Sequence, residues 1–328
     1  MTLPHLTQAQ APLTSEIEAV NEFGELHKVS IPAERALTVY VDKRELVTLM
    51  TLGANPELLV LGYLRNQRLV REVAEIQSIT VDWDVGAAAV KTRHGIADIE
   101  EKTAHRVVTT GCGQGSVFGG LMDELDKVAL PAGAFITQSQ LYGLVNTIRL
   151  KETTYKSAGS VHACALFSTA AGDAQMLLFV EDVGRHNAID TIAGWMWMNM
   201  APALSIACAA LPPGEAGLAR GGPAPGLQAS ALETSRVAQT LSTDGLVFYT
   251  TGRLTSEMVI KSAQMGVPIV VSRSGITQMG HQVAQSVGLC AIGRATNKRF
   301  LCYTQPQRLT LEPGLVSLSS SIAGKEAE

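Results

Sequence analysis

Residues 245–295 read GLVFYTTGRLTSEMVIKSAQMGVPIVVSRSGITQMGHQVAQSVGLCAIGRA, and this stretch decides the fold class of the chain. Short apolar runs that are typical of buried strands alternate with stretches that have the spacing of short helices. Strands joined in this way lie parallel in one sheet, because only a crossover connection returns the chain to the same end of the sheet. The stretch therefore predicts an α/β layered sheet. The expected strands are 245–253, 267–274 and 289–295, and the expected helices are 255–266 and 276–288.

The preceding residues extend this domain. Residues 136–151 predict a helix, since Thr137 and Gln140 form a capping-box pattern and the apolar residues after them share one face. Two strands and a mostly buried helix follow, and we interpret the Trp and Met residues of that helix as core. The strands are 161–168 and 174–183, the helix is 186–200, and the whole domain spans 137–308 with a Pro/Gly-rich flexible insertion at 211–230 and a tail at 309–328.

The first part of the chain predicts a smaller α+β domain over residues 23–136, preceded by a flexible tail at 1–22. Alternating apolar residues indicate two strands around the turn Asp42-Lys43-Arg44. A helix follows over 55–70, with Asn55 as its N-cap and Pro56 at its first position. Residues 75–92 predict a hairpin that turns near Gly86. The domain ends in the loop that contains Cys112.

Composition narrows the class of protein. The 328 residues carry a formal net charge of −4, 46% of them are hydrophobic and 17% are charged. Without a basic field we expect no nucleic-acid binding, and without an apolar run of about 20 residues we expect no membrane span. The N-terminus lacks the pattern of a signal peptide, so we expect a reduced, cytoplasmic protein. The five cysteines lack metal-ligand spacing, and we interpret Cys164, Cys208, Cys290 and Cys302 as core residues.

Two turns at the ends of predicted parallel strands indicate an anion-binding site. Residues 251–253 (Thr251, Gly252, Arg253) and 272–274 (Ser272, Arg273, Ser274) each precede a helix N-terminus. Ligands of open α/β sheets bind at this edge, where helix N–H groups and arginine favour phosphate. The alternative is two ordinary loops with solvated arginines. We expect Lys261 to form only an exposed pair with Glu257, one helical turn away.

The stretch EDVGRHNAID, residues 181–190, is denser in polar groups than a strand-to-helix junction requires. Asp182 could cap the helix and Gly184 could make the turn. These structural roles do not explain the presence of Arg185, His186 and Asn187, so we favour a functional role for these three residues. A histidine beside carboxylates can act as a general base or orient a thiol.

The stretch TTGCGQGSVFG, residues 109–119, places Cys112 between two glycines. Neighbouring N–H groups or a histidine would lower the pKa of such a thiol and make it reactive. The loop lacks the Lys-Ser/Thr ending of a phosphate-binding P-loop. A reactive cysteine and a plain glycine-rich turn both remain open from these residues alone.

Together these motifs resemble the FdhD family of formate dehydrogenase accessory sulfurtransferases. The similarity runs from Glu34 to Tyr303. It rests on ERALTVYVDKRELVTLMTLGANPELLVLGYLRNQRLV, SAGSVHACALF, EDVGRHNAID, TTGRLTSEMVIKSAQMGVPIVVSRSGIT and RATNKRFLCYT.

The resemblance implies a cytidine-deaminase-like three-layer α/β domain that lacks the zinc signature, so we expect no zinc or other bound metal. It also implies a sulfurtransferase that takes sulfur from a cysteine desulfurase as a persulfide on Cys112. The sulfur would pass to the molybdenum (or tungsten) bis(molybdopterin guanine dinucleotide) cofactor of apo-formate dehydrogenase. Arg185 and His186 would stabilise the thiolate or persulfide, and homodimerisation is expected. The cofactor-binding residues implied are Arg294, Ala295, Thr296, Asn297, Lys298 and Arg299, beside the turns 251–253 and 272–274.

One residue departs from the family pattern. Gly115 stands where many members have a second cysteine, so no disulfide can form within this loop. A relay with one cysteine remains chemically complete. The alternatives are a non-covalent cofactor-binding and insertion chaperone, and a Cys–His hydrolase that uses Cys112 and His186.

Overall fold

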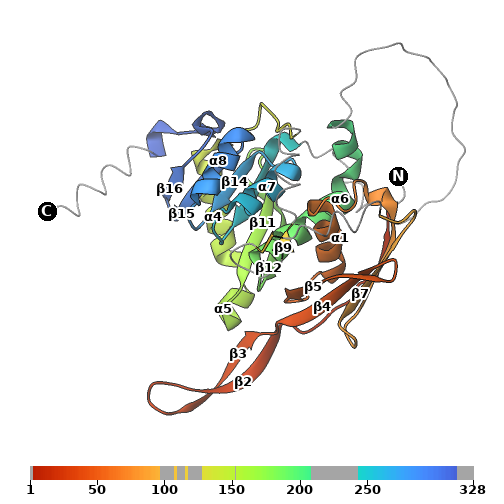
Figure 1. The fold of residues 1–328 in the computed structure, drawn as a ribbon. Coiled ribbons are helices and arrows are strands. Elements are labelled where there is room, and N and C mark those ends of the chain that lie inside the picture. The colour runs from red at the N-terminus through yellow and green to blue at the C-terminus, as the bar shows by residue number, and fades with distance from the viewer. Residues whose placement is uncertain are drawn as a thin grey trace, which may run out of the picture.

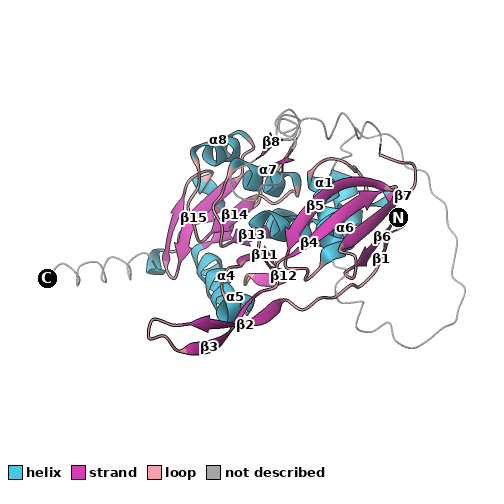
Figure 2. Cartoon of the chain, turned by 60° about the horizontal axis from the view of Figure 1, so that its bottom comes forward, coloured by secondary structure: helices cyan, strands magenta, loops and turns pink. Residues whose placement is uncertain are grey.

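The computed structural model describes residues 3–96, 107–108, 115–116, 128–151, 153–207 and 243–315. Within them the chain forms an N-terminal sheet and a larger second sheet, which lie side by side (Figures 1 and 2). Helices α1 (Pro56–Asn66) and α6 (Arg185–Ala207) join the two bodies. The predicted mixed α/β class is therefore observed.

The N-terminal sheet has five strands in the order β1-β6-β7-β4-β5. The turn between β4 and β5 takes Asp42 and Lys43 to φ values of 47° and 73°, as a two-residue hairpin turn requires. Gly86 has a φ of 61° at the turn between β6 and β7, so both predicted strand pairs are confirmed. The bounds are β1 (His5–Leu6), β4 (Arg35–Val41), β5 (Arg44–Thr51), β6 (Ile76–Asp82) and β7 (Ala87–Thr92), with a 3₁₀ turn at Val73–Glu75.

The expectation of a flexible tail at 1–22 is wrong for the residues the structure describes. Strands β2 (Thr14–Val20) and β3 (Leu26–Pro32) pair antiparallel and form a hairpin that projects from the body (Figure 1). Glu57 of α1 holds the segment before it, accepting hydrogen bonds from Thr7 Oγ1 at 2.7 Å and Ala9 N at 2.8 Å. Apolar Ile17, Val29 and Ile31 alternate with polar neighbours in these two strands, and the prediction of a tail overlooked this signal.

The second sheet has the order β12-β11-β13-β14-β15-β16. Strands β13, β14 and β15 are parallel, as the sequence predicts, and β11 runs antiparallel to both of its neighbours. Residues of α6, α7 and α8 pack on one face, whereas residues of α4 pack on the other. The strands are β11 (His162–Ser168), β12 (Gln175–Asp182), β13 (Leu246–Thr250), β14 (Ile269–Ser272), β15 (Cys290–Thr296) and β16 (Arg299–Cys302); the helices are α4 (Gln138–Lys151), α5 (Thr154–Ala158), α7 (Ser256–Gln264) and α8 (Gln278–Ser286), with 3₁₀ turns at Thr243–Gly245 and Pro306–Arg308.

The predicted capping box at the start of α4 is present. Thr137 N donates to Gln140 Oε1 at 2.9 Å, and Gln140 N donates to Thr137 Oγ1 at 3.2 Å. Both bonds satisfy N–H groups that a helix N-terminus leaves without partners.

The boundaries of the second body differ from the prediction. Strand β10 (Ile136–Thr137) pairs with β17 (Leu309–Thr310), so residues at 309–310 belong to this body and not to a tail. Val128 and Leu130 pack against its core, which places the boundary before residue 136. The predicted insertion at 211–230 lies outside the described residues, as does the last part of the predicted tail.

Two glycines allow α1 and α6 to cross very closely. A Cβ added at Gly62 would lie 1.6 Å from Asp190 O, and one added at Gly194 would lie 2.0 Å from Leu58 O. Trp197 of α6 is buried in the N-terminal core, and Met196 is buried in the second core. The interpretation of these α6 side chains as core is confirmed, and the crossing fixes one sheet on the other.

Candidate functional site

The predicted site residues converge on one edge of the second sheet. This edge carries the carboxyl ends of the parallel strands β13, β14 and β15. Because β11 is antiparallel to its neighbours, its first residue and the last residue of β12 lie at the same edge. The topology therefore brings together the start of α6 and the loops at 251–253, 272–274 and 294–299.

Hydrogen bonds fasten the three loops to one another. Ser272 Oγ donates to Gly252 O at 2.7 Å, and Ser274 Oγ donates to Thr251 O at 3.1 Å. Arg294 N donates to Ser274 O at 2.7 Å. Both serine side chains hold the backbone here, so the loops form one connected rim.

The rim carries exposed positive charge. Arg253, Arg273 and Arg294 are exposed, and the Arg273 guanidinium lies over the Tyr155 ring, 5.6 Å from its centroid. Arg185 is buried, and its aliphatic part fills the space beside Gly252, where an added Cβ would lie 2.7 Å from Arg185 Cδ. Three exposed guanidinium groups on one rim can bind a phosphorylated ligand.

His162 belongs to this edge, although we did not select it as a site residue from the sequence. It is half-buried at the start of β11. Burial lowers its pKa below the ordinary 6.5, and nearby positive charges lower it further. These charges belong to Arg185, His186, Arg273 and Arg253. The only signal in the sequence was its position in the quoted stretch SAGSVHACALF.

The loop at 294–299 is a tight connection between β15 and β16. Arg294 and Asn297 have φ values of 51° and 50°, which non-glycine residues seldom adopt. Thr296 pairs with Arg299, and Lys298 O accepts a hydrogen bond from Tyr142 OH at 3.1 Å. Ala295 is buried, whereas the other five residues of the loop are exposed. The implied cofactor loop is thus built to present polar groups at the rim.

Much of the EDVGRHNAID motif joins the two bodies. Asp182 accepts from Thr51 Oγ1 at 2.5 Å, from Leu52 N at 3.2 Å and from Gly184 N at 3.0 Å. Asn187 Nδ2 donates to Asp182 at 2.9 Å and to Met50 O at 2.6 Å. Asp182 and Asn187 therefore have structural partners that the sequence did not reveal.

Glu181 has a local structural partner. Its carboxylate accepts hydrogen bonds from Thr154 N at 2.8 Å and Tyr155 N at 3.1 Å, which are N–H groups at the start of α5. A carboxylate at this end of a helix is favourable. Glu181 therefore holds Tyr155, and with it the ring under Arg273, at the site.

A buried chain of charged groups runs behind the rim. Lys261 Nζ lies 2.9 Å from Asp190 Oδ2 and 3.5 Å from Glu257 Oε1, and Asn66 Nδ2 donates to Asp190 Oδ1 at 2.7 Å. Lys261 is 1% exposed, so the expectation of an exposed pair is wrong. Burial acts to lower its pKa, but the two carboxylates outweigh burial and raise the pKa of Lys261.

His186 ends this chain. Its Nδ1 lies 3.4 Å from Glu257 Oε1, and its side chain is 6% exposed. Burial lowers the pKa of His186 below 6.5, against the opposing effect of Glu257. The Glu257 carboxylate therefore faces Nδ1 of an imidazole whose charged form is disfavoured by burial.

The predicted thiol lies outside this description. Cys112 falls in 109–114, between the described pair β8 (Val107–Val108) and β9 (Gly115–Ser116), and Cys208 also lies outside the described residues. Cys164 and Cys290 are buried, which confirms their interpretation as core. Cys302 is half-buried and packs against the core on the α4 side of the sheet, so it lies at the margin of that core.

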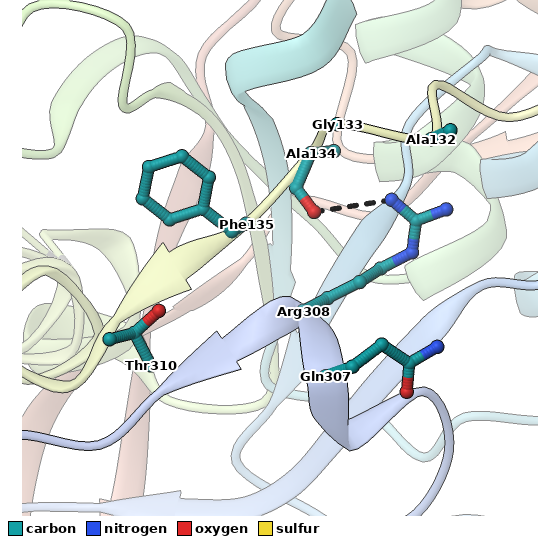
Figure 3. A pocket seen from close by; sticks show the side chains of 7 residues that line it. All are labelled: Ala132, Gly133, Ala134, Phe135, Gln307, Arg308 and Thr310. Carbon is teal, nitrogen blue, oxygen red and sulfur yellow. Dashed lines mark hydrogen bonds between the residues drawn. The ribbon is translucent and has the colours of Figure 1, made fainter.

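A cavity of about 620 Å³ lies elsewhere, where β10 meets β17 (Figure 3). Arg308 closes one side of it by donating to Pro131 O at 2.6 Å and Ala134 O at 3.2 Å. Its lining contains none of the predicted site residues. The lining residues are Ala132, Gly133, Ala134, Phe135, Gln307, Arg308 and Thr310.

Comparison with known proteins agrees with the resemblance inferred from the motifs. The model of the FdhD/NarQ family matches residues 32–208 and 235–310. The chain belongs to the FdhD/NarQ family. The chain is similar to the sulfur carrier protein FdhD of Bacillus subtilis. The two are 28% identical over 290 residues, which are 88% of this chain and 94% of the relative. The sulfur carrier protein FdhD of Bacillus licheniformis is 26% identical over 276 residues, covering 84% and 88%.

A solved structure shares the fold. A protein from Desulfotalea psychrophila, described as a formate dehydrogenase accessory protein, superimposes with a TM-score of 0.60. It is 20% identical in sequence, and the match covers 91% of this chain and all of that one. In the part of the chain that the structure describes, no helix has the length and apolar character needed to cross a bilayer.

Proposed function

We propose that this protein is a sulfurtransferase that matures formate dehydrogenase. It accepts sulfur from a cysteine desulfurase as a persulfide on Cys112 and delivers it to the molybdenum bis(molybdopterin guanine dinucleotide) cofactor, its bound substrate. Membership of the FdhD/NarQ family and the names of its relatives support this assignment. The protein acts in the cytoplasm, as a homodimer, on apo-formate dehydrogenase.

The observation that carries the proposal is the cationic rim. The loops at 251–253, 272–274 and 294–299 are hydrogen-bonded together and expose Arg253, Arg273 and Arg294. A bis-guanine-dinucleotide carries pyrophosphate groups, which guanidinium groups bind with paired hydrogen bonds. A cytidine-deaminase-like sheet would then hold a nucleotide at its strand ends without a metal.

The transfer involves two displacements at sulfur. The Cys112 thiolate attacks the outer sulfur of the desulfurase persulfide, and the desulfurase thiolate leaves. A two-electron donor centre of the bound substrate then attacks the outer sulfur of the Cys112 persulfide. The new bond to the substrate forms as the sulfur–sulfur bond breaks, and Cys112 leaves as the thiolate. We assign Arg185 to the positive field that stabilises the thiolate and persulfide. We assign His186, whose Nδ1 lies 3.4 Å from Glu257 Oε1, to a supporting role beside it.

Nucleotide binding tests the rim. Arg273→Gln removes one charged donor pair while its neighbours keep the loop in place, and a charge-assisted hydrogen bond contributes about 1.5–3 kcal/mol. We therefore expect the Kd for GDP, measured by calorimetry, to rise by roughly tenfold to a hundredfold. Lys91→Gln on β7 of the N-terminal sheet removes an equal, exposed charge outside the rim and should leave the Kd unchanged. Equal affinities of both variants and the unmodified protein would exclude the rim as the nucleotide site.

The second candidate is an insertion chaperone that binds the cofactor without sulfur chemistry. It is favoured by Gly115, which leaves Cys112 without a second thiol in its loop. In a strain that lacks its own sulfur carrier, Cys112→Ala should fail to restore formate dehydrogenase activity if sulfur passes through Cys112. Full restoration by Cys112→Ala would favour the chaperone.

A further inference from the structure

Cys290 and Cys302 form a thiol pair on neighbouring strands. Ile292 of β15 pairs with Cys302 of β16, so Cys290 lies diagonally across from Cys302 on the same face of the sheet. Their Sγ atoms are 3.9 Å apart. This is van der Waals contact between two sulfur atoms, and a disulfide between them requires the Sγ atoms to approach to roughly 2.05 Å.

The two thiols have different surroundings. Cys290 is completely buried, whereas Cys302 is half-buried on β16, the edge strand of the second sheet. Hydrogen bonding from Cys290 lowers the pKa of Cys302, while the same contact and burial raise the pKa of Cys290. Cys302 is therefore the thiol that reagents reach first and that ionises first, whereas Cys290 is buried beside it.

We infer that Cys290 and Cys302 are a redox modification site, which a small-molecule disulfide oxidises to an internal disulfide. The Cys302 thiolate attacks one sulfur of the disulfide RSSR and expels RS⁻, leaving a mixed disulfide on Cys302. The first RS⁻ takes up the proton that Cys302 lost on ionisation. Cys290 then attacks Sγ of Cys302, the bond between Cys302 and RS breaks, and the leaving group takes the Cys290 proton and departs as the second RSH. Two cysteine thiols are oxidised, and one RSSR becomes two RSH.

The disulfide would link the two strands that carry the loop at 294–299. Cys290 is the first residue of β15 and Cys302 is the last residue of β16, so the link closes the open end of this hairpin. Oxidation would therefore tighten the hairpin that presents Arg294 at the rim. The inference needs neither Cys112 nor sulfur transfer, so its failure and that of the proposed function are distinguishable.

Oxidised glutathione is the probe for a test on the full chain. After exposure, free thiols are alkylated under denaturing conditions and the digest is mapped by mass spectrometry without reduction. We expect a peptide in which Cys290 is linked to Cys302, and its loss on treatment with dithiothreitol. Cys164 is the matched control, because it is buried and its thiol contacts Thr250 Oγ1 at 3.3 Å and not another described cysteine. It should remain a free thiol.

Two variants define the order of events. Cys290→Ala should stop at glutathione bound to Cys302, with complete loss of the linked peptide. Cys302→Ala should leave Cys290 unmodified. An unmodified Cys302 in the full chain, or a Cys302 that stays glutathionylated without linking to Cys290, would overturn the inference even if either variant failed to fold.

Discussion

Gly194→Ala tests the crossing of α1 and α6, on which the relative position of the two sheets depends. The added Cβ would lie 2.0 Å from Leu58 O, whereas ordinary contact begins near 3.4 Å. The helices would have to separate by about 1.4 Å, the difference between these distances. The obstacle is backbone and cannot rotate away, so we take the upper end of the usual overpacking cost, about 3 kcal/mol. Alanine regains about 1 kcal/mol of helix propensity. We expect a net loss of about 2 kcal/mol.

The assay is urea unfolding followed by circular dichroism, with the variant and the unmodified protein fitted to a common slope. Gly143→Ala is the matched control, because Gly143 is an exposed residue of α4 and its added Cβ would meet nothing within 4 Å. That variant should gain up to about 1 kcal/mol. If Gly194→Ala were as stable as Gly143→Ala, the close crossing would be refuted.

Two further predictions concern the buried charges. Lys261→Met leaves Asp190 and Glu257 buried without their cation and should lower the free energy of unfolding by about 3–5 kcal/mol. The control Lys28→Met breaks the exposed pair with Glu16 and should lower it by at most about 1 kcal/mol. Equal urea midpoints of the two variants would contradict the burial of Lys261. The free energy of unfolding should also fall as the pH drops below about 6.5, because His162 and His186 have lower pKa values in the folded state than in the unfolded state. Their contribution to stability is complete above the unfolded-state pKa and is lost as the pH drops toward the folded-state pKa. The urea midpoint is measured between pH 7.5 and 5.5, and its dependence on pH should become weaker in His186→Gln but not in His27→Gln on the hairpin. An unchanged pH dependence in His186→Gln would count against the buried imidazole.

The regular part of the fold could be predicted because several local signals agreed. The strands and helices of 245–295 alternate in a strict order, and Thr137 with Gln140 marked the start of α4. The hairpin of β2 and β3 was not predicted, because it contributes to none of the hydrophobic cores and its apolar side chains remain exposed. Local periodicity reports burial, and a projecting hairpin buries little.

The candidate site was predictable in outline but not in its tertiary contacts. The turns at 251–253 and 272–274 were found because parallel strands end together, and the structure joins them by hydrogen bonds. Lys261 was misjudged because its spacing from Glu257 reveals only one partner, whereas Asp190 comes from another helix. The roles of Asp182 and Asn187 likewise depend on β5, more than 130 residues away.

The most direct test of sulfur transfer is to locate the residue that carries the sulfur. The full chain, incubated with a cysteine desulfurase and cysteine, is measured by intact mass and then mapped without reduction. Sulfur transfer through Cys112 predicts a gain of one sulfur atom on the peptide that contains Cys112, which reductant removes and Cys112→Ala abolishes. A protein that gains no sulfur, or a Cys112→Ala variant that gains as much as the unmodified chain, would contradict it.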